Sequence, residues 1–115
     1  MLISRVMNER RSSPRVRVNL PVRWEGVVSR ENATVTDLSR SGCFVLTGGK
    51  VDVKELVRLE IQLTETQTVN FWAEVVDAAS DIGFALKFNS SSPEDEAALA
   101  KFLEKFFQAN GPKNS

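Results

Sequence analysis

The sequence predicts an all-β domain with one helix, in which six antiparallel strands form a small barrel and the helix packs on it. Apolar and polar residues alternate with a period of two in six short segments between residues 15 and 88. Turn residues separate these segments, and closing the sheet removes the edges that an open sheet would expose. An apolar stripe at helical spacing follows the last strand.

Each predicted strand has one apolar and one polar face. The first covers residues 15–24, with Trp24 on the apolar side and therefore in the core. Pro21 indicates an edge or a bulge, because proline donates no backbone hydrogen bond. The last hairpin turn is expected at 77–81 and should contain Asp77. The other strands are predicted at 33–38, 43–46, 57–63, 69–75 and 82–88.

The helix has a recognisable start and end. Ser92 fits the N-cap, with Asp95 three residues later and Pro93 at the first helical position. Gly111 and Pro112 are expected to end the helix. Its stripe is more typical of packing on a core than of cofactor binding, and it consists of Leu99, Phe102, Leu103, Phe106 and Phe107.

The formal net charge is zero, but the charge is unevenly distributed. The first 17 residues contain five arginines and one acid, so they carry about +4, and the remainder carries about −4. An arginine fork can grip a phosphate or a guanine edge with two hydrogen bonds, although a charged terminus can equally be only solvated. We expect a flexible arm at 1–14, the barrel and helix at 15–108, and a tail at 109–115. The sequence leaves open whether translation starts at Met1 or Met7.

Composition argues against catalysis and metal binding. The chain has no histidine and one cysteine, Cys43, which excludes a Cys/His nucleophile, the usual tetrahedral zinc site and an internal disulfide. No apolar run approaches the roughly 20 residues of a membrane span. We therefore expect a cytoplasmic protein with no catalytic residues, metal, cofactor or membrane contact.

Two short motifs fall at strand ends. Arg11 and Arg15 are four residues apart where the arm meets the first strand. Asp37-Leu-Ser39-Arg-Ser-Gly42 lies at the turn between the second and third strands. Each motif alone is weak evidence, because such residues are common in turns. Their combination at strand ends of one barrel is more specific.

On these motifs the sequence resembles the PilZ domain family of bacterial receptors for cyclic di-GMP. That family carries RxxxR before the first strand and [D/N]xSxxG at the second turn. The resemblance extends to Leu20-Pro21-Val22, to the strand 83–88 and to the terminal helix, and so covers residues 10 to 107. It implies a six-stranded PilZ-like barrel with ligand contacts from Arg11, Arg15, Asp37, Ser39 and Gly42.

The chemistry of these residues suits the ligand. An arginine matches the O6 and N7 acceptors of guanine, and the Asp37 carboxylate can accept from the guanine N1–H and N2–H₂ donors. Ser39 can donate to a phosphate or base. Gly42 is expected to allow a positive φ in the turn and a close approach of the ligand to the backbone.

Two further residues extend the predicted site. In the family, an arginine just before RxxxR accompanies two stacked cyclic di-GMP molecules, so Arg10 implies that mode. Trp72 should point outward, where it either stacks on a guanine or is covered by the helix or a loop. Two positions depart from the family: Ser41 replaces a frequent glycine, and Asp77 replaces a frequent arginine.

The resulting hypothesis is a stand-alone cyclic di-GMP sensor or adaptor. Its arm orders on the ligand and changes a surface read by an unidentified protein partner. The alternative is a PilZ-like interaction module that binds no nucleotide, although such members usually lack one of the motifs. A barrel for single-stranded nucleic acid ranks lower, because the polar faces mix Glu60 and Glu74 with Arg58. We therefore expect no polymeric nucleic acid partner.

Overall fold

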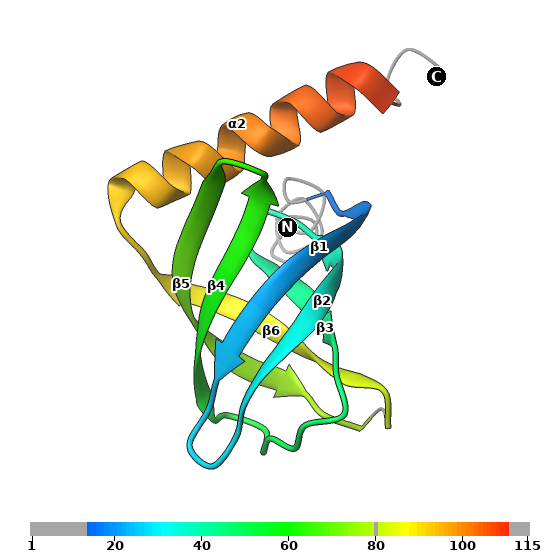
Figure 1. The fold of residues 1–115 in the computed structure, drawn as a ribbon, viewed down its shortest axis with the longest axis vertical. Coiled ribbons are helices and arrows are strands. Elements are labelled where there is room, and N and C mark those ends of the chain that lie inside the picture. The colour runs from blue at the N-terminus through cyan, green and yellow to red at the C-terminus, as the bar shows by residue number, and fades with distance from the viewer. Residues whose placement is uncertain (1–13, 80, 111–115) are drawn as a thin grey trace, which may run out of the picture.

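The computed structural model describes residues 14–79 and 81–110 and confirms the predicted barrel (Figure 1). Six antiparallel strands close in the order β1-β2-β3-β6-β5-β4, and one helix lies across one end. The elements are β1 (Val16–Glu25), β2 (Arg30–Leu38), β3 (Gly42–Leu46), β4 (Leu56–Thr64), β5 (Gln67–Asp77), β6 (Gly83–Ser90) and α2 (Pro93–Asn110).

Successive strands run in opposite directions, so the connections fall into two groups (Figure 1). We call the end of the barrel near α2 the helix end. It carries the start of β1, the β2–β3 turn, the β4–β5 hairpin and the β6–α2 link. The other three connections, 26–29, 47–55 and 78–82, form the base. Because β3 and β4 are not neighbours in the sheet, the segment 47–55 has to cross the base.

The inward residues of all six strands form one core. In β4 the alternation is strict, with every second residue buried. Trp24 is fully buried, which confirms its predicted place, and its ring meets Phe84 edge to face with 5.1 Å between centroids. Its indole N–H donates to the Thr47 hydroxyl at 3.3 Å, so the polar atom of this large side chain is satisfied.

Polar contacts hold the base loops together. The Glu55 carboxylate accepts from the backbone N–H of Val27 at 2.7 Å and of Asp52 at 3.0 Å. The Thr47 hydroxyl donates to Glu31 Oε1 at 2.8 Å. The segment 47–55 is thereby fixed to the β1–β2 hairpin and to β2, and it closes the base.

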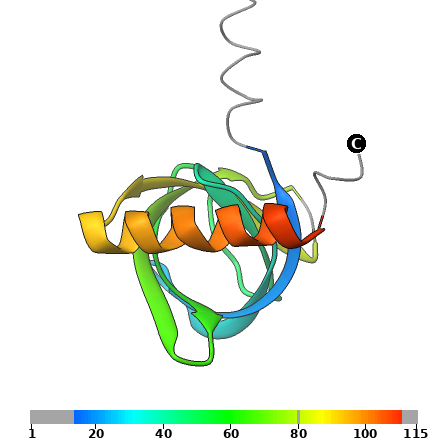
Figure 2. The same ribbon diagram turned by 90° about the horizontal axis from the view of Figure 1, so that it is seen from above.

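The helix begins as predicted and covers the other opening. Ser92 Oγ accepts from the Asp95 N–H at 3.1 Å, which confirms the N-cap. The Asp95 carboxylate instead accepts from the Asn70 N–H on β5 at 3.0 Å and anchors α2 to the sheet. Leu99 and Leu103 are buried against the barrel, while the three phenylalanines of the stripe are partly buried. Figure 2 shows α2 lying across the ring of strands.

The first strand explains why Pro21 is tolerated. β1 pairs with β2 along its whole length but with β4 only over Val22–Glu25. Its register with β2 shifts between Arg17 and Leu20, which confirms an irregularity near Pro21. Pro21 therefore lies just outside the β4 ladder, where its missing N–H removes no hydrogen bond to β4.

Several strand ends differ from the predictions. β2 begins at Arg30, three residues early, because its pairing with β1 continues to the hairpin. Asp77 ends β5 rather than lying wholly in the turn, and its Oδ1 accepts from the Ala79 N–H at 3.0 Å. Ile82 precedes β6 and is 61% exposed. The predicted stop at Gly111-Pro112 lies outside the described residues, as does nearly all of the predicted arm.

Candidate functional site

A groove of about 280 Å³ lies on the outer face of the barrel beside the β2–β3 turn. Four of the predicted site residues line it: Arg15, Asp37, Ser39 and Gly42. We call it the turn groove. The rest of its lining comes from β2, β3, β5, β6 and the turn, and consists of Leu38, Ser41, Cys43, Phe44, Val76, Ala85, Leu86 and Lys87.

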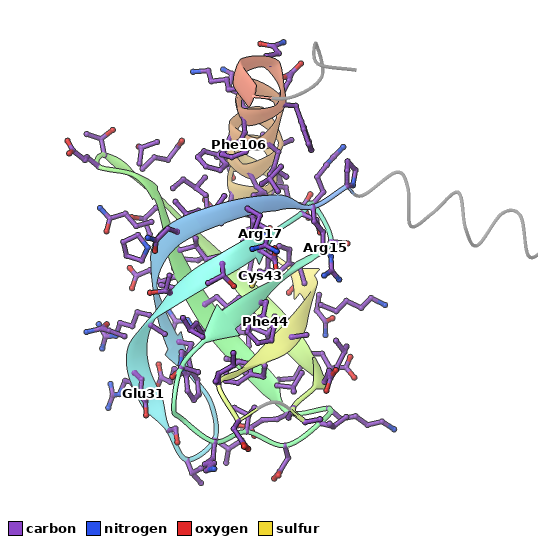
Figure 3. All side chains as sticks on the ribbon, turned by 90° about the vertical axis from the view of Figure 1, so that its right-hand side faces the viewer. Arg15, Arg17, Glu31, Cys43, Phe44 and Phe106 are labelled. Atoms are coloured by element: carbon purple, nitrogen blue, oxygen red, sulfur yellow. The ribbon has the colours of Figure 1, made fainter. Side chains whose placement is uncertain are left out.

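Strand pairing brings the first motif beside the second. Val16 lies opposite Leu38 and Arg17 opposite Asp37, so Arg15 is carried to the second motif's turn. The Arg17 Nε lies 3.9 Å from Asp37 Oδ1, the one ion pair found among the residues that the structure describes. Figure 3 shows Arg15 and Arg17 on the face that carries Phe44. Arg17 does not line the groove but faces Asp37 at its edge, and it was not among the predicted site residues. The alternation along the first strand, which puts Arg17 on the outer face next to the buried Val16, was the signal that could have indicated it.

Ser39 organises the turn from within. It is the single polar side chain among the buried residues described, at 4% exposed. Its hydroxyl accepts from the N–H groups of Ser41 at 3.1 Å and Gly42 at 3.2 Å, and it lies 3.3 Å from the Gly42 carbonyl oxygen. This pattern is a side-chain-stabilised turn. The hydroxyl that was predicted to meet the ligand is therefore already engaged with the turn backbone.

The structure requires a glycine at position 42 for a reason that was not predicted. No described glycine has a positive φ, so the expectation of a left-handed turn residue is wrong. A Cβ at Gly42 would instead strike the carbonyl oxygen of Leu86 on the neighbouring strand β6. The Phe88 N–H donates to the Ser41 carbonyl oxygen at 2.8 Å. The absence of a side chain lets β3 and β6 meet closely beside the groove.

Cys43 contributes to the inner wall of the groove. Its side chain points into the barrel and is 8% exposed. Burial raises the pKa of the Cys43 thiol from 9.0 to about 12. The thiol is therefore protonated at neutral pH and behaves as a small apolar group.

Of the other predicted site residues, the structure describes Trp72. Arg10 and Arg11 fall outside the described residues. Trp72 faces outward on β5 at 48% exposed, as predicted, opposite Arg58 on β4 and Ser90 on β6. It is not part of the lining of the turn groove.

A second cavity of about 430 Å³ lies on the other side of the turn, toward the start of α2. Arg40 and Ser41 line it from the turn, and Ser41 also lines the turn groove. Glu96 and Leu99 contribute from the helix. The turn of the second motif thus separates two hollows, one of which reaches α2.

The part of the chain that the structure describes contains no group of three or more His, Cys, Asp or Glu side chains arranged to hold a metal ion. No helix in it is long and apolar enough to span a bilayer.

Comparison with known proteins gives the family. The PilZ domain family matches residues 9–105, and the chain belongs to that family. PilZ domain proteins are typically non-enzymatic binding or adaptor proteins. No curated protein sequence matches the chain significantly.

Solved structures share the fold at low identity. The inhibitor of motility MotI (DgrA) of Bacillus subtilis has a TM-score of 0.70 at 19% identity, over 88% of this chain and 53% of that one. YcgR of Escherichia coli, solved in complex with c-di-GMP, gives 0.71 at 16% identity, over 87% of this chain and 47% of that one. The PilZ domain of CeSA from a cellulose-synthesizing bacterium gives 0.65 at 15%, over 82% of this chain and 98% of that one. This chain therefore spans about half the length of MotI and YcgR.

Proposed function

We propose that this protein is a cyclic di-GMP receptor that acts as an adaptor for a protein partner. The observation that carries the proposal is the turn groove, in which Arg15 lies with Asp37, Ser39 and Gly42. These residues come from two motifs that are 22 positions apart, from Arg15 to Asp37. Membership of the PilZ family and the YcgR complex with c-di-GMP support the same ligand.

The groove has the chemistry that a guanine nucleotide needs. Arg15 offers a donor fork to a phosphate or to guanine O6 and N7. Asp37 is 34% exposed and offers acceptors to the guanine N–H donors. Ser39 holds the backbone of the turn beside Asp37 in place, which lowers the entropic cost of binding.

In this proposal Arg10 and Arg11 reach the ligand from the arm, residues 1–14, which becomes ordered on binding. Ordering costs roughly 1–2 kcal/mol per residue, and micromolar binding corresponds to about −8.2 kcal/mol. Several charge-assisted hydrogen bonds are therefore needed, and binding should weaken as salt is added. The covered surface would then be read by a protein partner in the cytoplasm.

Arg10 and Trp72 bear on the number of ligand molecules. Two stacked molecules would extend beyond the turn groove, and Trp72, half exposed on β5, offers a ring for one of the guanines. Trp72→Ala should then weaken binding at least several-fold. An unchanged affinity in this variant would remove Trp72 from the ligand site.

The deciding experiment is isothermal titration of the full chain with cyclic di-GMP, GTP and a short single-stranded oligonucleotide. Micromolar or tighter binding of cyclic di-GMP alone, with two ligands per chain, supports the proposal. One ligand per chain would contradict the stacked mode but not the receptor. Absence of cyclic di-GMP binding would favour the interaction module, and binding of the oligonucleotide would favour a nucleic-acid-binding barrel.

A further inference from the structure

The turn groove contains a cation that belongs to neither motif. Lys87 lies on β6 with an exposed, outward side chain and lines the groove together with Arg15. Arg15 is brought in by the start of β1, whereas Lys87 is brought in through the pairing of β6 with β3. The groove is therefore bordered by positive charge from two separate segments, the residue before β1 and strand β6.

The Lys87 ammonium is available to a ligand. On β5 the residue opposite Lys87 is Glu74. The two side chains form no ion pair within 4.0 Å, because the only such pair over residues 14–79 and 81–110 is Arg17–Asp37. The neighbour of Lys87 across β3 is Gly42, which has no side chain. The directly opposite residue of β3 therefore offers the Lys87 ammonium no polar side chain. A lysine is a flexible point charge that can follow a phosphate.

A cyclic dinucleotide has two phosphodiesters on opposite sides of its ring. Cations on one wall of a groove can neutralise one of them, and the other needs a cation on the opposite wall. Across the lining, Arg15 and Lys87 are separated by Asp37, Gly42 and Phe44, which lie on the strands between them.

We propose that Lys87 pairs with one phosphodiester of a cyclic dinucleotide in the turn groove, while the arginines at the start of β1 hold the other. This inference rests on the proposed function. It makes Lys87 a determinant of preference for a ligand with two phosphodiesters over a mononucleotide.

The test is a titration with cyclic di-GMP at low and high salt for the parent and four variants. Lys87→Met removes the charge but keeps most of the stem, Lys87→Arg restores the charge, and Lys87→Glu reverses it. Lys101→Met is the matched control, because Lys101 is exposed on α2 and this substitution removes the same charge outside the groove. Thermal unfolding without ligand checks that each variant folds like the parent.

We expect Lys87→Met to weaken binding about tenfold and to reduce its salt dependence. Lys87→Arg should keep most of the affinity, Lys87→Glu should lose more than Lys87→Met, and Lys101→Met should match the parent. Equal affinities for Lys87→Met and Lys101→Met would overturn the role of Lys87 while leaving the receptor intact. A parent that binds no cyclic di-GMP would instead overturn the proposed function.

Should Lys87→Met fold poorly, the parent alone decides the question. The side-chain resonances of Lys87, followed by NMR as cyclic di-GMP is added, should shift strongly if the ammonium meets a phosphate. Unmoved Lys87 resonances beside shifted Gly42 and Phe44 resonances would overturn the inference.

Discussion

Arg17 and Asp37 face each other across β1 and β2, with 3.9 Å between Arg17 Nε and Asp37 Oδ1. The Arg17 side chain is 94% exposed and that of Asp37 is 34% exposed. Pairs this open to water contribute little to stability. The Asp37 carboxylate therefore lies at the edge of the turn groove without being committed to its partner.

The first prediction concerns Asp37. Asp37→Ala should abolish measurable cyclic di-GMP binding yet change the free energy of unfolding by less than about 1 kcal/mol. Asp37→Asn should retain binding, because its amide oxygen still accepts a hydrogen bond. Calorimetric titration and urea denaturation measure the two effects. Binding by Asp37→Ala at parental affinity would contradict the assignment of Asp37.

The second prediction concerns the arginines of the first motif. Arg15→Ala and Arg11→Ala should each lower affinity by tenfold or more, since hydrogen bonds to charged groups are among the strongest at such sites. Arg23→Ala is the control, because Arg23 is exposed on β1 but lies outside the turn groove. Titration and thermal unfolding together separate a lost contact from a lost fold. Parental affinity in both motif variants would refute the receptor assignment.

The third prediction tests the close approach of β3 and β6. Gly42→Ala should destabilise the fold by about 2 kcal/mol or more, because its Cβ would meet a backbone carbonyl oxygen that cannot move aside cheaply. Gly48→Ala, in the base loop, has no heavy atom within 4 Å of the added Cβ and should be nearly neutral. Urea denaturation measures the difference. Equal stabilities would show that the strands can separate locally.

The fourth prediction follows from the Cys43 thiol, whose pKa burial raises from 9.0 to about 12. Between these values the unfolded chain releases a proton that the folded chain keeps. The stabilisation linked to this group is complete below pH 9 and is lost as the pH rises toward 12, by at most about 1.4 kcal/mol per pH unit. Urea denaturation at pH 8 and pH 10 should show a steeper loss in the parent than in Cys43→Ala. Parallel losses would place the thiol in contact with water.

The alternation of residue types was enough to predict the barrel, the burial of Trp24 and the helix cap at Ser92. These features depend on local pattern and side-chain chemistry. The end of a strand depends on its neighbour, which is why β2 begins at Arg30 rather than at residue 33.

The site was predictable only in part for the same reason. Its motif residues could be found along the chain. The clash that requires Gly42 involves Leu86, which lies 44 positions away on β6, a strand that pairs with β3 but does not follow it in the sequence. The facing of Arg17 and Asp37 depends on a register that shifts within β1. The groove position of Lys87 depends on the β3–β6 pairing, which no local pattern indicates.

The inaccessible native thiol also makes the protein convenient to label. Val28 is 82% exposed in the β1–β2 hairpin, at the opposite end of the barrel from the β2–β3 turn (Figure 1). A maleimide dye should therefore react selectively with Val28→Cys without removal of the native sulfhydryl. The attached fluorophore would lie far from the proposed nucleotide site. Its fluorescence anisotropy would rise when the labelled protein binds a partner and rotates more slowly.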